Sequence, residues 1–331
     1  MKVKRENPWR NHPHHEGLVN IGTHSLWASI SGPIRQRNDP LVIFITGAGA
    51  SCAVYVKLQQ KLSYFARTLF SDRAGYDQST LPPSVDKIYA EDSARGLTKL
   101  LSTTELEPPY VLVAHSYGGI IARSFLEMHR ENPDVVVGMM LLDSATELML
   151  ALIPRIPPTE LDNIARNVNW EKLTNLKQQS GMTDEEWNYA LDAQERSSDA
   201  LKKEDTHASA HQLALRYQLD TSTLEGRPLS VIRYNATSDY QMLYDAGVEK
   251  GDGTEDERRK AKDFIQTFGL FHDQIARAQC RLSEDATYMY YDQWGHDLPM
   301  RRPTVAVEDI RKLLARVCDK HAQRTVGPQN S

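Results

Sequence analysis

A serine with small residues around it follows an apolar run and precedes a helical pattern. Ala114-His115-Ser116-Tyr117-Gly118-Gly119 comes directly after the run Tyr110 to Ala114 and before the helical pattern of Ile120 to Arg130. A nucleophile elbow needs this strand–turn–helix context, because only small residues fit two positions before and two after the serine. Ala114 and Gly118 occupy those positions here, with Ala114 in place of the commoner glycine. The pattern predicts that Ser116 is a nucleophile.

An attacking serine needs a base, and His296 is the best candidate among the eleven histidines. It lies in the segment WGHDLP, after the last predicted strand and before a closing helix, where a loop would bring it over Ser116. His115 would point away from the serine in such a turn. The cluster His12, His14 and His15 could bind a metal, but such short runs near a terminus are typical of disordered ends. Since no other spacing supports metal ligation, we expect no metal.

The base in turn needs an acid to orient it, and two aspartates could do so. Asp143 stands at the end of the apolar run Val135 to Leu142, so its reach is short and rigid. Asp239 lies five residues past Tyr234, the end of another apolar run, so its place depends on the loop between. The shorter reach favours Asp143, and Asp239 stays open as the alternative acid.

An oxyanion intermediate needs two backbone N–H donors. One would come from Tyr117, the residue after the nucleophile, and the other from Ala48 in the small-residue loop Gly47 to Ser51. The same loop holds a Gly-x-Gly pair, which alone is weak evidence for dinucleotide binding. The further glycine and the acidic residue that such a site requires are missing, so we expect no nucleotide cofactor.

The elements that would position these residues alternate between strands and helices. Six apolar runs predict buried strands: Leu41 to Thr46, Ala66 to Ser71, Tyr110 to Ala114, Val135 to Leu142, Leu229 to Tyr234 and Ala286 to Asp292. Continuous rather than alternating apolar runs are typical of parallel strands covered on both faces. With helical patterns between them, they predict an α/β doubly wound sheet, and weak alternation before Leu41 predicts an antiparallel hairpin at its edge.

The alternation stops in the polar stretch 146–227, which we interpret as a helical cap (lid) inserted over the sheet. Thr159 could cap one of its helices, and Thr183 with Glu186 forms a capping box before another. The predicted organisation is an N-terminal arm at 1–17, a core at 18–145 and 228–318, the cap at 146–227 and a C-terminal tail at 319–331. The polar stretch 245–262 is predicted to be a solvated loop that leads into a helix.

Composition and charge exclude several classes of protein. The 331 residues carry 39 Lys and Arg against 44 Asp and Glu, a net charge of −5, which argues against nucleic-acid binding. The first residues lack the apolar core of a signal peptide, and no run is long enough to span a membrane. Three scattered cysteines, Cys52, Cys280 and Cys318, cannot build a disulfide framework and suit a reducing compartment. We therefore expect a cytoplasmic protein with no membrane span.

From about Leu18 to Val317 the chain resembles the α/β-hydrolase superfamily. The matching segments are TGAGAS (46–51), SDRAGYDQS (71–79), PPYVLVAHSYGGIIAR (108–123), MMLLDSA (139–145) and WGHDLPMRRP (294–303). The DRAG turn and the AHSYGG elbow look like those of capped, esterase-like serine hydrolases, many of which accompany fungal secondary-metabolite pathways. Thr46 stands where many members have His or Asn, and Asp77 where the turn usually has Gly.

The resemblance implies a mostly parallel eight-stranded sheet, a lid and no cofactor. It places the nucleophile on Ser116, the base on His296 and the oxyanion donors on Ala48 and Tyr117, and leaves Asp143 and Asp239 both open as the acid. The favoured hypothesis is hydrolysis of an ester, lactone or thioester of a bulky, partly apolar small molecule. The alternatives are a C–C-bond-cleaving or cyclising enzyme of the same fold, and a hydrolase-fold binding protein without catalysis.

Overall fold

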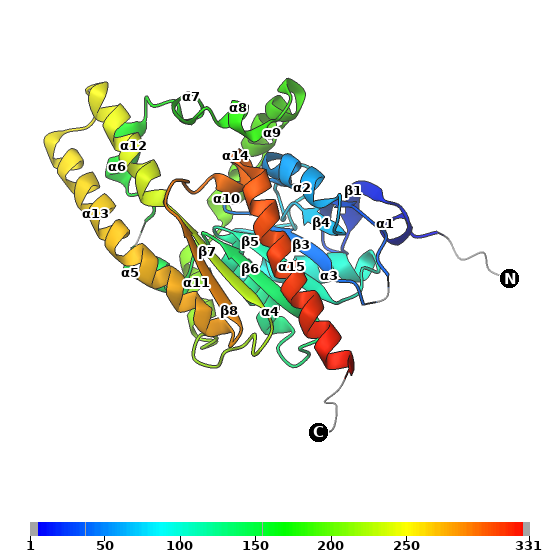
Figure 1. Ribbon diagram of the computed structural model, residues 1–331. Helices are drawn as coiled ribbons and strands as arrows, with labels where there is room; N and C mark the ends of the chain where they lie inside the picture. The colour runs from blue at the N-terminus through cyan, green and yellow to red at the C-terminus, as the bar shows by residue number, and fades with distance from the viewer. Residues whose placement is uncertain (1–5, 37, 154, 327–331) are drawn as a thin grey trace.

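The computed structural model of the protein describes residues 6–36, 38–153 and 155–326. Its centre is one eight-stranded sheet in the order β1-β2-β4-β3-β5-β6-β7-β8 (Figure 1). The strands are β1 (His14–Asn20), β2 (Ser25–Ser31), β3 (Leu41–Ile45), β4 (Thr68–Ser71), β5 (Tyr110–His115), β6 (Val136–Leu142), β7 (Leu229–Tyr234) and β8 (Ala286–Tyr291). The predicted α/β fold with a mostly parallel sheet is confirmed.

The strands that lead to the predicted site residues are buried on both faces. Every residue of β3, β5 and β7 is buried, as the continuous apolar runs predict. Parallel pairing runs from β4 through β3, β5, β6 and β7 to β8. Because parallel strands end at the same edge of a sheet, the loops after β3, β5, β6 and β7 meet there.

The first two strands form the predicted antiparallel hairpin, with His14 opposite Ser31, and β2 pairs antiparallel with β4. The hairpin begins earlier than predicted. Residues assigned to an N-terminal arm form α1 (Pro8–Asn11) and the start of β1. Four carbonyl groups in this region, those of Trp9, His12, Pro13 and Gly32, accept hydrogen bonds from the buried Arg67 guanidinium, which fixes the segment on the sheet.

Two helical layers cover the sheet. On one face α3 (Ala90–Thr103) and α4 (Gly118–Met128) pack with the strands into a large apolar cluster. On the other face η1 (Cys52–Tyr55), α2 (Val56–Leu62), α14 (Leu298–Arg301) and α15 (Pro303–Val326) build a second cluster. The closing helix is longer than predicted, because α15 continues as far as Val326 through much of the expected tail; positions 327–331 lie outside the described residues.

The predicted cap region contains seven helices in its described part. They are α5 (Glu147–Leu152), α6 (Thr159–Ala165), α7 (Trp170–Thr174), α8 (Leu176–Ser180), α9 (Asp184–Arg196), α10 (Ser198–Lys203) and α11 (Thr206–Ala214). Figure 1 shows α7, α8 and α9 lying above the sheet on the side where α14 begins. Thr183 and Glu186 form the predicted capping box of α9. Thr159 is instead the first residue of α6, after Pro158 at the N-cap position.

The segment after β7 differs from the prediction. The stretch expected to be a solvated loop lies within α12 (Ala236–Glu249) and α13 (Glu255–Ala278), which a short turn connects; η2 (Gln279–Leu282) follows. Helices α6, α12 and α13 share an apolar cluster of their own around Ile164, Tyr244 and Ile265. The charged run that suggested a loop covers the exposed side of an amphipathic helix. Helices α12 and α13, which lie in the predicted core segment 228–318, therefore pack against α6 of the predicted cap region.

None of the helices in the described ranges combines the length and the apolar character that crossing a membrane requires. All three cysteines are free, with Cys52 buried and Cys318 exposed.

Candidate active site

Ser116 lies in a strained turn between β5 and α4. Its φ angle of 56° falls in the left-handed region that a side chain with a Cβ rarely adopts. The turn is fixed by hydrogen bonds from the Ser116 N–H to the Leu142 carbonyl (3.1 Å) and from the Ala145 N–H to the Ser116 carbonyl (2.9 Å). A Cβ on Gly118 would come within 2.3 Å of the Ile45 carbonyl oxygen, so the small residue predicted there is sterically required.

Asp143 directly follows β6 and points at His296. Its Oδ2 lies 2.6 Å from Nδ1 of His296, and its Oδ1 accepts a hydrogen bond from the Tyr234 N–H (3.0 Å). The Asp143 backbone also has a positive φ angle, 42°, and its N–H donates to the Ile232 carbonyl (2.7 Å). Asp143 is therefore held rigidly from β7 while its carboxylate faces the predicted base.

A second histidine, His272 of α13, contacts the same carboxylate. Its Nε2 lies 3.3 Å from Oδ1 of Asp143, and the side chain is buried. Within the described ranges its Nδ1 has no hydrogen-bond partner. A proton on Nδ1 would be a buried donor without an acceptor, whereas a proton on Nε2 faces the Asp143 carboxylate. The sequence offered no signal for His272, because a lone histidine in a long amphipathic helix matches no motif.

These contacts shift the pKa values of Asp143 and His296 in opposite directions. Burial alone would raise the pKa of Asp143, but His272 and His296 outweigh it and hold that pKa well below its usual range. Loss of hydration opposes protonation of His296, yet the hydrogen bond and negative charge of Asp143 raise its pKa from 6.5 to about 9. The geometry thus joins a carboxylate that stays ionised to an imidazole of increased basicity.

Asp239, the alternative acid, contacts the backbone of His296 rather than its ring. It lies in the first turn of α12, and its Oδ2 accepts the His296 N–H at 2.6 Å. No described group bonds to its buried Oδ1. Burial raises the pKa of Asp239 to about 6. The carboxylate is placed to hold the loop that carries His296, and the ring of that histidine is left to Asp143.

His115 also supports the His296 loop, a function that sequence analysis missed. Its Nδ1 lies 2.8 Å from the Tyr55 hydroxyl, and its Nε2 lies 3.0 Å from the carbonyl oxygen of His296. The two imidazole rings lie side by side with centroids 4.6 Å apart. Burial lowers the pKa of His115 to about 3, so the ring is neutral and can donate from Nε2. Since His115 immediately precedes Ser116, this contact brings the His296 loop to the elbow.

The loop after β3 carries Ala48, the residue predicted to be the second oxyanion donor. Ala48 is exposed, whereas Tyr117 is buried with its backbone at the start of α4. Neither backbone N–H of this pair has an acceptor among the described groups. A Cβ on Gly47 would lie 2.9 Å from Cβ of Ser116 and 3.4 Å from its Oγ. The loop therefore passes directly over the serine, as an oxyanion hole requires.

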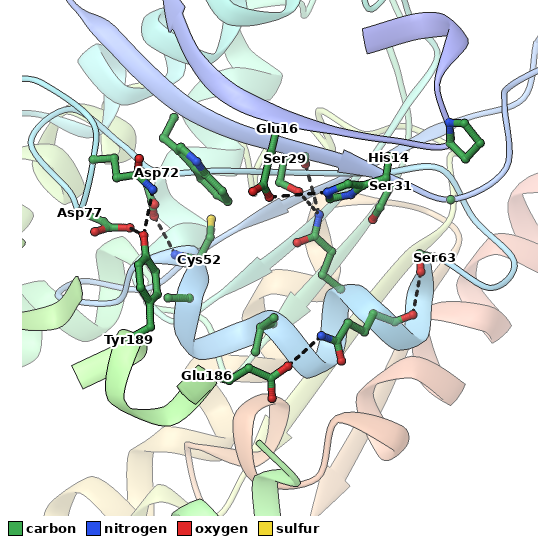
Figure 2. A pocket seen from close by; sticks show the side chains of 18 of the residues that line it. His14, Glu16, Ser29, Ser31, Cys52, Ser63, Asp72, Asp77, Glu186 and Tyr189 are labelled. Carbon is green, nitrogen blue, oxygen red and sulfur yellow. Dashed lines mark hydrogen bonds and ion pairs between the residues drawn. The ribbon is translucent and has the colours of Figure 1, made fainter. Parts of the chain in front are cut away.

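A cavity of about 940 Å³ lies between the β1–β2 hairpin, α2 and α9 (Figure 2). Cys52 and Asp72 line it, but neither Ser116 nor His296 does. Burial raises the pKa of the Cys52 thiol well above its usual range, which makes it a poor nucleophile.

In the described ranges no group of histidine, cysteine and acidic side chains has a geometry that could hold a metal. His14 and His15 belong to β1, and His12 follows α1.

A family comparison agrees with this architecture. The model of the "Alpha/beta hydrolase family" matches residues 42–310, which include the elbow, both aspartates and His296. The chain belongs to the alpha/beta hydrolase family. The order of the eight strands and the helices on both faces of the sheet are those of an α/β hydrolase.

Two curated relatives align with nearly the whole chain. "Probable transporter efuK" of Hormonema carpetanum is 27% identical over 328 residues, which cover 97% of this chain and 46% of that protein. This chain thus spans less than half the length of that relative. "AB hydrolase superfamily protein" of Gibberella zeae is 26% identical and aligned over 93% of this chain and 98% of its own.

Solved structures share the fold at low sequence identity. Cfl2 of Burkholderia cenocepacia superposes with a TM-score of 0.60 at 16% identity, covering 91% of this chain and 96% of its own. A thermophilic esterase of Thermogutta terrifontis superposes with a TM-score of 0.52 at 17% identity, covering 92% and 99%. At this level of identity, both similarities show a shared fold and no shared activity.

Proposed function

We propose that the protein is a serine hydrolase in which Ser116, His296 and Asp143 form the catalytic triad. The observation that carries the proposal is the 2.6 Å contact between Asp143 and Nδ1 of His296, beside a serine in a strained elbow. With Nδ1 bound to the carboxylate, Nε2 is the ring nitrogen left to take a proton. Asp239 remains the alternative acid, but its contact with the backbone of His296 favours a supporting role.

The reaction would follow the acyl-enzyme route. Ser116 Oγ attacks the substrate carbonyl while His296 takes its proton, and Asp143 stabilises the resulting imidazolium. The N–H groups of Ala48 and Tyr117 stabilise the negative oxygen of the tetrahedral intermediate; loss of one such donor costs about 3–4 kcal/mol in comparable enzymes. His296 then returns the proton to the leaving group, and water releases the acid.

We propose a carboxylic ester, lactone or thioester of a bulky, partly apolar molecule as the substrate. The DRAG turn (72–75) and the elbow are of the kind found in capped, esterase-like members of the family. Exposed apolar side chains on α5, Leu148 and Leu152, follow the Asp143 loop at the entrance of the cap. Trp170 has a different task, because its indole N–H donates to Asp297 beside His296 (2.8 Å) and ties the cap to that loop.

A fluorophosphonate tests the proposal, because it phosphonylates only activated serines. Intact mass is measured for the wild type, Ser116→Ala and His296→Ala after incubation with the reagent. We expect one adduct on the wild type, mapped to Ser116, and none on either variant. If the folded wild type takes no adduct from a small, unhindered reagent, the serine hydrolase proposal is wrong. Adducts without turnover of any ester or lactone would favour the C–C-cleaving or cyclising chemistry.

A cytoplasmic location is a second, separate proposal. It is supported by the three unpaired and scattered cysteines, of which Cys280 and Cys318 are not deeply buried. Alkylation of the native protein, isolated without reductant, should label these two thiols. A disulfide in that material would contradict the proposal.

A further inference from the structure

Glu204 is a buried carboxylate that the cap contributes to the region of the oxyanion loop. It lies between α10 and α11, and its side chain is 1% exposed. The backbone around it is fixed to the core, because the Ile88 N–H donates to the Lys203 carbonyl (2.8 Å) and the Asp205 N–H donates to the Ile88 carbonyl (3.0 Å). A charged group at such a depth is stable only with close partners of opposite charge or with good donors.

One partner of Glu204 is Arg73, which contacts the loop at Thr46 and Gly47, the two residues before Ala48. Nε of Arg73 donates to Glu204 Oε1 (2.8 Å). Its Nη1 donates to the carbonyl oxygen and the hydroxyl of Thr46 (2.9 and 2.8 Å), and Nη2 donates to the Gly47 carbonyl (3.0 Å). The planar guanidinium thus aligns three acceptors of the loop, provided that its own position is fixed by Glu204.

The other partner is Tyr76, which contacts the loop at Gly49, the residue after Ala48. The Tyr76 hydroxyl donates to Glu204 Oε2 (2.7 Å) and accepts the Gly49 N–H (3.0 Å). The Arg73 guanidinium also lies over the Tyr76 ring, 4.3 Å from its centroid. Both neighbours of Ala48 are therefore held through side chains that meet at the Glu204 carboxylate.

We propose that Glu204 is a positioning residue that couples the cap to the oxyanion hole by fixing the backbone on both sides of Ala48. The inference rests on the proposed serine hydrolase function. The hydrogen bond from the Ala48 N–H to the oxyanion depends on the direction of that N–H, which Gly47 and Gly49 set. Movement of the α10–α11 segment away from the core would release both, so that the oxyanion hole is complete only with the cap in place.

Other ion pairs also join the cap to the core, but they do not touch this loop. Lys57 pairs with Glu186 of α9 (2.8 Å), and Lys87 pairs with Asp205 (2.6 Å). Lys87→Gln removes a cap–core contact one residue away from Glu204 while every hydrogen bond of residues 46–49 described above is kept. Lys87→Gln is therefore the matched control, because it shows what a general loosening of the cap does to activity.

The first variant for the test is Glu204→Gln, which keeps the shape of the side chain and removes its charge. Since loss of one oxyanion donor costs about 10²–10³ in kcat, partial misalignment of Ala48 should lower kcat by roughly 10- to 100-fold, with KM within about threefold of wild type. Binding of benzeneboronic acid, which forms a tetrahedral adduct on the serine, should weaken in parallel with kcat. Lys87→Gln should retain wild-type values.

Hydrogen exchange of the peptide that contains residues 46–50 measures the positioning itself. Glu204→Gln should increase exchange there, and Lys87→Gln should not. In case Glu204→Gln does not fold, Tyr76→Phe removes the hydrogen bonds of the Tyr76 hydroxyl to Gly49 and Glu204 and keeps those of Arg73. It should give a smaller loss of kcat with faster exchange in the same peptide. Unchanged exchange in both variants, or an equal loss in Lys87→Gln, would overturn the inference. A wild type that takes no fluorophosphonate adduct would refute the serine chemistry, whereas the exchange comparison would still decide the role of Glu204.

Discussion

The carboxylate of Asp239 accepts the backbone N–H of His296 at 2.6 Å, while the imidazole of the same residue contacts Asp143. Two acids that follow neighbouring strands thus meet at one histidine, with different tasks. An asparagine at 239 can still accept the backbone N–H, whereas an asparagine at 143 presents an amide where Nδ1–H needs an anion. We therefore expect Asp143→Asn to lower kcat by about 10⁴, as with the equivalent change in a known triad, and Asp239→Asn by no more than about threefold.

Steady-state kinetics on an activated ester, with circular dichroism to check folding, makes the comparison. A large loss in Asp239→Asn together with near-normal turnover in Asp143→Asn would reverse the assignment of the acid. Asp239→Ala is a useful third variant, because it removes the acceptor and should loosen the His296 loop. It should cost more activity than Asp239→Asn.

The pH dependence of activity should show the raised pKa of His296. The base must be neutral to accept the serine proton, and its pKa is raised to about 9 by Asp143. We expect kcat/KM to increase steeply below pH 9, to reach half of its maximum near pH 9 and to level off above it. In Asp143→Asn the residual activity should titrate closer to the ordinary value of about 6.5. Rates between pH 5.5 and 10 on a non-ionising ester, corrected for spontaneous hydrolysis, test this.

The raised pKa of His296 also predicts that the free energy of unfolding depends on pH. Because protonation of His296 is more favourable in the folded than in the unfolded chain, its stabilising effect is fully present below about pH 6.5. It is lost as the pH rises through about 9. The difference in urea midpoint between wild type and His296→Gln should therefore shrink from pH 6 to pH 10. A difference that is constant with pH would contradict the raised pKa.

The local patterns of the sequence predicted the sheet and the elbow because their causes are local. The burial of β5 on both faces appears as a continuous apolar run, and the tight turn at Ser116 appears as Ala114 and Gly118. Asp239 was uncertain since its place depends on the start of α12, where Asn235 caps the helix by accepting the Ser238 N–H. His272 and Glu204 act on residues more than a hundred positions away, and no spacing in the sequence indicates such contacts.

Gly47→Ala tests whether the loop after β3 lies over Ser116, the proposed nucleophile. The added methyl group would lie 2.9 Å from Cβ of Ser116 and 3.4 Å from its Oγ, so one of the two segments must move. The φ angle of Gly47 is not in the left-handed region, so alanine causes no backbone strain there. We expect at least a tenfold loss of kcat/KM, as for other displacements of about 1 Å near reacting groups, with little change in melting temperature. An unchanged kcat/KM would place the loop away from the serine.

Gly295→Ala tests the contact between Asp239 and the His296 loop. A Cβ at position 295 would lie 1.9 Å from Oδ1 of Asp239, so the carboxylate and the loop could not both keep their places. The variant should be less stable and less active than wild type. Combining it with Asp239→Ala should restore part of the activity lost in Gly295→Ala, because the clash is then removed. If the two effects are simply additive, the two residues are not in contact.

Substitution of His272 tests how far a second histidine supports Asp143, the proposed triad acid. Its Nε2 lies 3.3 Å from Asp143 Oδ1, so it helps to hold the carboxylate ionised and oriented toward His296. Glutamine can place an amide N–H near the position of Nε2, but leucine cannot donate. We expect His272→Leu to lower kcat by about tenfold, the effect of losing a hydrogen bond worth about 1.4 kcal/mol to a charged group, and His272→Gln to recover most of it.

The pH profile separates this role from simple packing. In His272→Leu, Asp143 loses one neighbour that stabilises its charge and interacts more strongly with His296, so the pKa of His296 should rise further and the activity should fall at a higher pH on the acidic side than in wild type. A packing defect alone would lower kcat at every pH and leave the profile unchanged in shape. Equal losses in His272→Leu and His272→Gln, with no change in the profile, would show that His272 fills space and does not act on the acid.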